Sequence, residues 1–187
     1  METGILNLTD AHQINAMTAR GYWQAFESVK NSIKKILAGK NPGEIIEIDH
    51  KTWYQELFAP SVAVGLSKLA DLIGYRTHQV YIRSSMHTPL NSEAVRDAMP
   101  ILFELLKNES DGAVRAILGH FFFVYIHPYM DGNGSVGRFL MNSMLVTGGY
   151  NWITILVEKR SEYMDTLEKA SVNGDVSDFA DFITSLI

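Results

Sequence analysis

Residues 127–138 read HPYMDGNGSVGR, and this polar, glycine-rich stretch lies between two strongly apolar segments. The preceding segment, residues 112–126, is apolar nearly all round, as is typical of a central buried helix. The following segment, residues 135–146, is also apolar and ends before Gly148-Gly149. Apolar helices are rarely joined by such a loop unless the loop has a function. We therefore expect the functional site in residues 127–138.

The second half of this loop fits the binding of phosphate. Gly132 and Gly134 allow positive φ angles and the close approach of a ligand. The unpaired N–H groups of a helix that begins near Ser135 favour an anion, and the helix dipole adds to this preference. Arg138 follows three residues later, so its guanidinium can contact a phosphate oxygen at the same helix end.

Two further residues of the loop supply a base and a metal ligand. His127, with an ordinary pKa of about 6.5, can accept a proton from a hydroxyl at neutral pH. Asp131 offers an oxygen ligand suited to a Mg²⁺ ion that bridges phosphates. Each feature alone is usually structural, since Asp-Gly-Asn-Gly is a common turn sequence. Their combination predicts a site for phosphate-group transfer.

The remaining sequence predicts a mainly α protein with about eight helices in a single domain that spans residues 1–187. Asp49, Asn91 and Asp111 are expected helix caps, and Pro100 is expected to bend a helix. β-Branched and aromatic residues over 79–83, with Pro89 close behind, predict a short strand or hairpin. The expected helices cover residues 11–37, 49–58, 60–74, 92–107, 112–126, 135–146, 161–170 and 175–186.

Composition excludes several classes of protein. The 187 residues are 47% hydrophobic and 20% charged, which is typical of a globular domain. The net charge of −5 disfavours binding to nucleic acid or to an anionic membrane. The chain has no cysteine, so disulfides, thiol catalysis and cysteine-bound zinc are excluded. The sequence shows no membrane-spanning run and no signal peptide over residues 1–13, so a cytoplasmic location is expected.

The loop resembles the signature of the Fic family of the Fic/DOC type, which reads His-Pro-Phe-x-Asp/Glu-Gly-Asn-Gly-Arg-x-x-Arg. Tyr129 stands in place of the usual phenylalanine, and Ser135 stands in place of the first arginine. The resemblance covers residues 18–187, with residues 74–89 similar to the family's flap region. The matching positions are His127, Pro128, Asp131, Gly132, Asn133, Gly134 and Arg138.

The resemblance implies a Fic-type helical bundle with a short β-hairpin flap. It also implies an enzyme that transfers AMP from ATP to a Ser, Thr or Tyr hydroxyl of a target protein. His127 would then deprotonate the target hydroxyl, and Asp131 would hold Mg²⁺. The nucleotide phosphates would lie against Gly132, Asn133, Gly134, Ser135 and Arg138.

The flap, residues 78–88, would hold the target segment by strand addition. Its docking residues would be Val80, Tyr81, Ile82 and Arg83. Some relatives are inhibited by a helix with the pattern Ser/Thr-x-x-x-Glu-Gly/Asn. Neither the segment from Thr52 nor that from Thr154 completes this pattern. Restraint within the chain is therefore not expected, and an inhibitory partner protein remains an open alternative.

Ser135 leaves several functions open, because a guanidinium on transferring phosphate can be worth several kcal/mol. The chain is then a slow transferase, an enzyme for another donor, or a nucleotide-binding and interaction module with weak catalysis. A substitution of the first signature arginine by serine that was made for crystallisation would give the same sequence. Phosphoryl transfer and removal of AMP are further alternatives, although the Gly132-Asn133-Gly134 run favours nucleotidyl transfer. His120, seven residues before His127, is expected to be a core histidine rather than a metal ligand.

Overall fold

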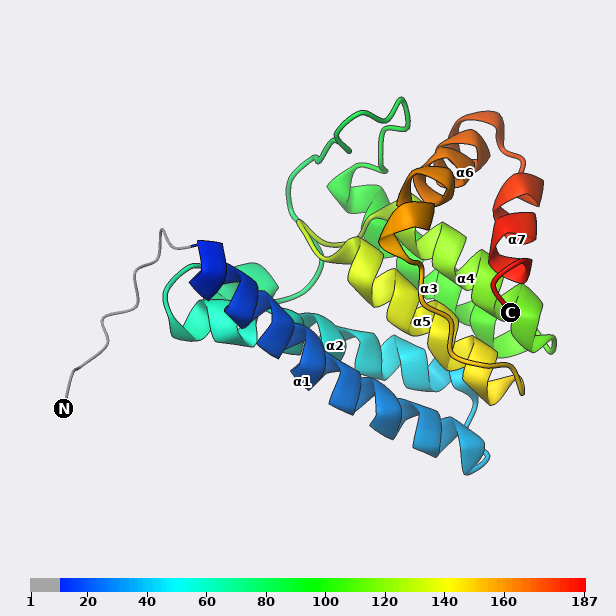
Figure 1. Cartoon of the computed structure of the whole chain (residues 1–187), viewed down its shortest axis with the longest axis horizontal. Coiled ribbons are helices and arrows are strands. Elements are labelled where there is room, and N and C mark those ends of the chain that lie inside the picture. Colours follow the sequence, from blue (N-terminus) through cyan, green and yellow to red (C-terminus); the bar gives the residue numbers. More distant parts are fainter. Residues whose placement is uncertain (1–10) are drawn as a thin grey trace.

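The computed structural model describes residues 11–187, in which seven α-helices and two short 3₁₀ helices form and no strand is present (Figure 1). The mainly α prediction is confirmed. No helix among these residues is long and apolar enough to cross a membrane. The elements are α1 (Ala11–Leu37), α2 (Pro42–Ala63), η1 (Leu69–Leu72), α3 (Ser92–Asn108), α4 (Gly112–Ile126), α5 (Asn133–Thr147), η2 (Val157–Lys159), α6 (Arg160–Asn173) and α7 (Ser177–Thr184).

The helices pack in pairs around one core. α1 lies along α2, and α4 lies along α5, with α3 bridging α2 and α4 (Figure 1). α6 and α7 pack together, and α7 also contacts α4. Gly21 of α1 faces the backbone of Leu57 so closely that a Cβ atom would lie 2.0 Å from its carbonyl oxygen. A glycine at this position therefore allows the two long helices to touch.

Two of the three predicted helix caps, Asn91 and Asp111, are confirmed. The side chain of Asn91 accepts a hydrogen bond from the N–H of Ala94 (2.8 Å). The carboxylate of Asp111 accepts hydrogen bonds from Ala113 (2.8 Å) and Val114 (3.0 Å). These bonds fix where α3 and α4 begin. α4 ends at Ile126, directly before the loop 127–138.

The prediction of two helices over residues 49–74 was wrong. A single helix, α2, begins at Pro42 with Asn41 as its cap and continues through Pro60 to Ala63. Asp49 does not cap a helix, because its carboxylate accepts a hydrogen bond from Ser32 (2.7 Å) and pairs with Lys35 (2.7 Å) on α1. Packing along α1 thus outweighs the helix-breaking preference of an internal proline.

The predicted hairpin over the flap is not confirmed, because no strand forms there. A turn is present at its tip, where the N–H of Ser85 donates to Ile82 (3.2 Å) and Ser84 has a φ of 62°. No ladder forms within residues 77–91. The side chain of Gln79 donates to the carbonyls of Val80 (3.1 Å) and Pro89 (2.9 Å). Side-chain donors thus satisfy carbonyls that a ladder would otherwise use.

Candidate active site

His127 ends α4 in the left-handed conformation, with φ 56° and ψ 61°. Its N–H still bonds to the carbonyl of Phe123 (3.1 Å), so the residue turns the chain out of the helix. Its Nδ1 lies 3.2 Å from the carbonyl of Val124. Burial is the main cause that lowers the pKa of His127 below its usual value, and the charge of Arg76 adds to it. The imidazole is therefore neutral at pH 7 and able to accept a proton.

The loop after His127 is closed by Asn133. The Asn133 side chain accepts a hydrogen bond from the N–H of Tyr129 (2.9 Å) and donates one to the carbonyl of the same residue (2.9 Å). The Tyr129 ring stacks on Tyr54 of α2, with ring centroids 3.7 Å apart. Because the amide of Asn133 is buried and engaged in this way, Asn133 offers a ligand its backbone N–H rather than its side chain.

We predict that Asn133→Ala lowers the free energy of unfolding by about 2–4 kcal/mol, since two buried backbone groups of Tyr129 lose their partners. Urea denaturation measures this change. Asn108→Ala is the matched control, because that exposed amide contacts only Glu104 and its loss should cost at most about 0.5 kcal/mol. A loss for Asn133→Ala no larger than that of the control would contradict the closing role.

The helix start that the sequence predicts as an anion-binding end lies at Asn133, two residues earlier than expected. Gly132 is the N-terminal cap, with a φ of 76°, and no side chain caps this helix end. The N–H groups of Ser135 and Val136 both bond to the carbonyl of Gly132 (3.0 Å each). A Cβ on Gly132 would lie 2.8 Å from the Phe58 ring. Glycine is thus needed for both the φ angle and the packing.

Arg138 lies beside this helix end. Its Nη2 donates to the Ser135 hydroxyl (3.3 Å), and its guanidinium would be only 3.2 Å from a Cβ on Gly134. Burial raises the pKa of the Tyr163 hydroxyl in α6. The charge of Arg138 and its hydrogen bond to this hydroxyl lower the same pKa by a smaller amount. The structure therefore brings together Ser135, Arg138 and the glycine turn, as the sequence predicts.

His120 is a core residue, as predicted. It is fully buried, and its Nε2 lies 2.7 Å from the Tyr163 hydroxyl. Burial lowers the pKa of His120 to about 4, so the ring is neutral at pH 7. A Cβ on Gly137 would lie 2.8 Å from its Nδ1. His120 thus packs α4 against α5 and supports the tyrosine that contacts Arg138.

Asp131 is exposed at the tip of the loop. One of its carboxylate oxygens accepts a hydrogen bond from the N–H of Gly132 (2.6 Å), which orients the group at the start of α5. Within residues 11–187, no group of three or more His, Asp or Glu side chains could by itself hold a metal ion. A single carboxylate still fits Mg²⁺, because this ion is commonly bound by one or two carboxylates together with substrate phosphates.

The flap is tied to the body at two places that the sequence does not reveal. At its tip, Glu168 of α6 accepts hydrogen bonds from the Ser85 hydroxyl (2.5 Å) and the N–H of Met86 (2.6 Å). At its base, the buried Arg76 donates to several backbone carbonyls. Of the predicted docking residues, Tyr81 and Arg83 are exposed, while Val80 and Ile82 are half-buried.

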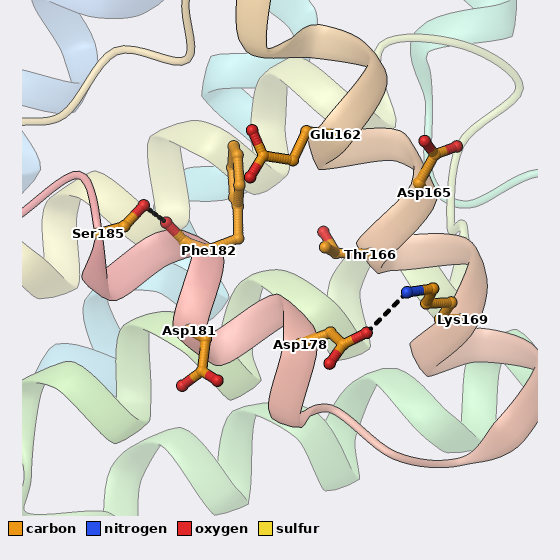
Figure 2. A pocket seen from close by; sticks show the side chains of 8 residues that line it. All are labelled: Glu162, Asp165, Thr166, Lys169, Asp178, Asp181, Phe182 and Ser185. Carbon is orange, nitrogen blue, oxygen red and sulfur yellow. Dashed lines mark hydrogen bonds and ion pairs between the residues drawn. The ribbon is translucent and has the colours of Figure 1, made fainter.

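A separate hollow of about 550 Å³ lies between α6 and α7 (Figure 2). It shares no lining residue with the loop 127–138. Its only lining cation, Lys169, is paired with Asp178 (2.9 Å). The carboxylates that line it are Glu162, Asp165, Asp178 and Asp181. This excess of negative charge disfavours a nucleotide, so the loop remains the candidate active site.

A sequence model described as the Fic/DOC family matches residues 41–145 of the chain, which contain α2 to α4, the loop and most of α5. The chain belongs to the Fic/DOC family. The protein adenylyltransferase fic-1 of Caenorhabditis elegans is 33% identical over 112 residues, which are 58% of this chain and 22% of that protein. The protein adenylyltransferase Fic of Drosophila willistoni is 34% identical over 113 residues, with the same coverage. The chain thus spans about a fifth of these curated relatives.

Solved Fic structures have the same fold. The Fic-1 fragment of C. elegans (residues 134–508 of that protein) superposes with a TM-score of 0.74 at 23% identity, over 97% of this chain and 51% of that one. The BepC effector of Bartonella tribocorum, solved with bound AMPPNP, gives a TM-score of 0.65 at 14% identity over 100% of this chain and 94% of that one. These likenesses establish the Fic fold for α1 to α7.

Proposed function

We propose that this Fic chain is a protein adenylyltransferase, which transfers AMP from ATP to a hydroxyl side chain of a target protein. The observation that carries the proposal is the closed loop, because it holds a neutral imidazole and an uncapped helix start on one short segment. The adenylyltransferase names of the relatives and the AMPPNP bound to BepC support the same reaction and the same donor.

His127 acts as the general base in this proposal. A proton on Nδ1 can be donated to the Val124 carbonyl 3.2 Å away, which leaves Nε2 free to accept the proton of the target hydroxyl. The hydroxyl oxygen then forms a bond to the α-phosphorus of ATP. The bond from that phosphorus to the bridging oxygen breaks, and pyrophosphate leaves.

The start of α5 stabilises the phosphate charge. The first N–H groups of the helix, those of Asn133 and Gly134, have no acceptor within the helix and are available to a phosphate oxygen. Arg138 adds a positive charge at the same end. Asp131 would hold Mg²⁺, which supplies further neutralisation of the phosphates when it is bound.

We predict that Asp131→Ala removes most of the Mg²⁺ dependence of ATP binding, because no second carboxylate stands in the loop. Calorimetric titration of ATP, with Mg²⁺ and with EDTA, measures the effect. Asp131→Asn is the companion variant, since it keeps the oxygen that accepts from Gly132 but loses the charge. If the variants keep the full metal effect on affinity, Asp131 does not hold the ion.

The target segment is proposed to lie against the flap. Tyr81 is 78% exposed near the tip, and the backbone beside it is not part of any ladder. An extended peptide could therefore add to it by main-chain hydrogen bonds, with Val80, Ile82 and Arg83 beside it. The fixed base and tip of the flap favour this role, because a fixed edge loses less conformational entropy on binding.

The second candidate is a nucleotide-binding and interaction module with weak catalysis, and Ser135 is the observation that favours it. At this position the chain offers only a hydroxyl, and that hydroxyl already accepts from Arg138. The single-domain organisation, a cytoplasmic location and an inhibitory partner protein stay predictions. One continuous core from Ala25 to Ile183 supports the first of these.

Mass spectrometry of the products tests the proposal. The chain is incubated with ATP, Mg²⁺ and a panel of candidate proteins, and modified peptides are sequenced. We expect an adenylyl group on a Ser, Thr or Tyr hydroxyl of the chain itself or of a target. A phosphoryl group in its place would overturn the reaction type, and bound but unreacted ATP would favour the module.

A further inference from the structure

Arg76 is a buried cation whose partners are all backbone carbonyls. The residue is only 3% exposed. Its Nε donates to the carbonyl of His127 (2.7 Å), its Nη1 to the carbonyl of His78 (2.9 Å), and its Nη2 to the carbonyl of Leu90. Among residues 11–187, none of its hydrogen-bond or ion-pair partners is a carboxylate. Burial lowers the pKa of Arg76, although the group stays charged.

A buried charge of this kind is costly unless its hydrogen bonds are made, so its contacts need a structural explanation. A guanidinium has five donors in a fixed plane and can therefore hold several acceptors in one geometry. Here the acceptors come from three separate places: His78 at the start of the flap, Leu90 just beyond its end, and His127 in the catalytic loop. The backbone N–H of Arg76 adds a bond to the carbonyl of Pro128 (2.9 Å).

The bond from Arg76 to the His127 carbonyl bears on the unusual backbone conformation of His127. A left-handed conformation is uncommon for a residue other than glycine and has to be maintained by its surroundings. In His127, the N–H is bonded to Phe123 and the carbonyl is bonded to Arg76, so both ends of the residue are fixed. The direction of the imidazole follows from this backbone conformation.

We infer that Arg76 is a positioning residue that sets the flap and the peptide of His127 in one arrangement, so that the target hydroxyl and the base meet. This inference rests on the proposed adenylyl transfer. Arg76 does not act on the nucleotide phosphates, since its guanidinium is bonded to carbonyls on the side of the loop where α4 ends. Its loss should therefore reduce the turnover of bound ATP and target and spare ATP affinity.

The first test compares Arg76→Met and Arg76→Lys with a matched control, Arg115→Met. Arg115 also donates through its guanidinium to a backbone carbonyl, that of Glu109, but at the end of α3. We expect both Arg76 variants to lower kcat for transfer by about 10- to 100-fold, as expected for a misplaced reacting group. ATP affinity should stay within a few-fold, and Arg115→Met should keep kcat. An unchanged kcat in both Arg76 variants overturns the inference.

The pH profile separates positioning from general loss of structure. Arg76, His87 and Asp131 are the charged or titratable groups that act on His127. Arg76→Met removes a positive charge, so the His127 pKa should rise and the acidic limb of kcat/KM should move to higher pH. Arg76→Lys keeps the charge and should leave that limb in place. A limb at the same pH in all three proteins would contradict contact between Arg76 and a catalytic His127.

Amide hydrogen exchange tests the inference even if no transfer is found. Loss of Arg76 should speed exchange in the flap and in residues 127–133, with little change in α1 and α2. If Arg76→Met folds poorly, hydrogen exchange is measured on Arg76→Lys in its place. Faster exchange confined to these two segments supports the inference whether or not the wild-type protein transfers AMP. Equal exchange in the wild-type and variant proteins overturns it, and absence of transfer in the wild-type protein argues only against the proposed function.

Discussion

His127→Ala will lower the rate of AMP transfer by about 10²- to 10⁴-fold, the usual contribution of a general base. ATP affinity should remain within a few-fold, because the imidazole lies at the end of α4, whereas the N–H groups proposed to bind phosphate lie at the start of α5. The measurements are single-turnover transfer from labelled ATP and calorimetric ATP binding. Wild-type transfer rates in the variant would show that His127 is not the base.

His127→Asn separates loss of the imidazole from loss of the backbone turn at residue 127. Residue 127 has a φ of 56°, and alanine tolerates this conformation less well than asparagine. The asparagine variant therefore keeps the turn and lacks a group that titrates near neutral pH. We expect it to be as inactive as the alanine variant but closer to the wild-type protein in thermal stability. Activity restored by asparagine would mean that residue 127 acts through backbone shape.

Ser135→Arg should raise kcat/KM for transfer about ten-fold or more. Residue 135 stands in the first turn of α5, and its hydroxyl is 3.3 Å from Nη2 of Arg138. In the proposed function, an arginine here would share the charge of the nucleotide phosphates with Arg138. One charge-assisted contact is worth roughly 1.5–3 kcal/mol, which corresponds to a ten-fold rate gain or more.

Ser135→Gln is the control for this prediction, since glutamine brings a long polar side chain without charge. We expect little gain from it. The same rise in both variants would mean that size, and not charge, limits the site. An unchanged or lower rate in the arginine variant, with normal stability, would favour the binding module or another donor.

Features set by short stretches of sequence could be predicted. The caps at Asn91 and Asp111 depend on a side chain that reaches an N–H two or three residues away, so composition reveals them. The loop 127–138 could also be predicted from a short stretch of sequence. Its His127, Asp131, two glycines and Arg138 lie within twelve residues of one another. The resemblance of this loop to the Fic signature agrees with the family match, which covers residues 41–145.

Features set by distant contacts could not be predicted. Pro60 lies inside α2 because this helix packs along α1, a contact that no local pattern indicates. Arg76 stands 51 residues before His127, and nothing around it in the sequence distinguishes a buried arginine from an exposed one. The flap forms no strand, and the bond from Gln79 to the carbonyl of Pro89, ten residues away, was not indicated by the pattern of residues 79–83.

The most direct test of adenylyl transfer is a pair of incubations with ATP labelled in the α-phosphate or in the γ-phosphate. Each is carried out with Mg²⁺ on the wild-type chain, on His127→Asn and on Ser135→Arg, and protein-bound label is counted. We predict label from α-labelled ATP only, more of it with Ser135→Arg and almost none with His127→Asn. Label from γ-labelled ATP, or none from either in wild-type and Ser135→Arg proteins that bind ATP, would contradict adenylyl transfer.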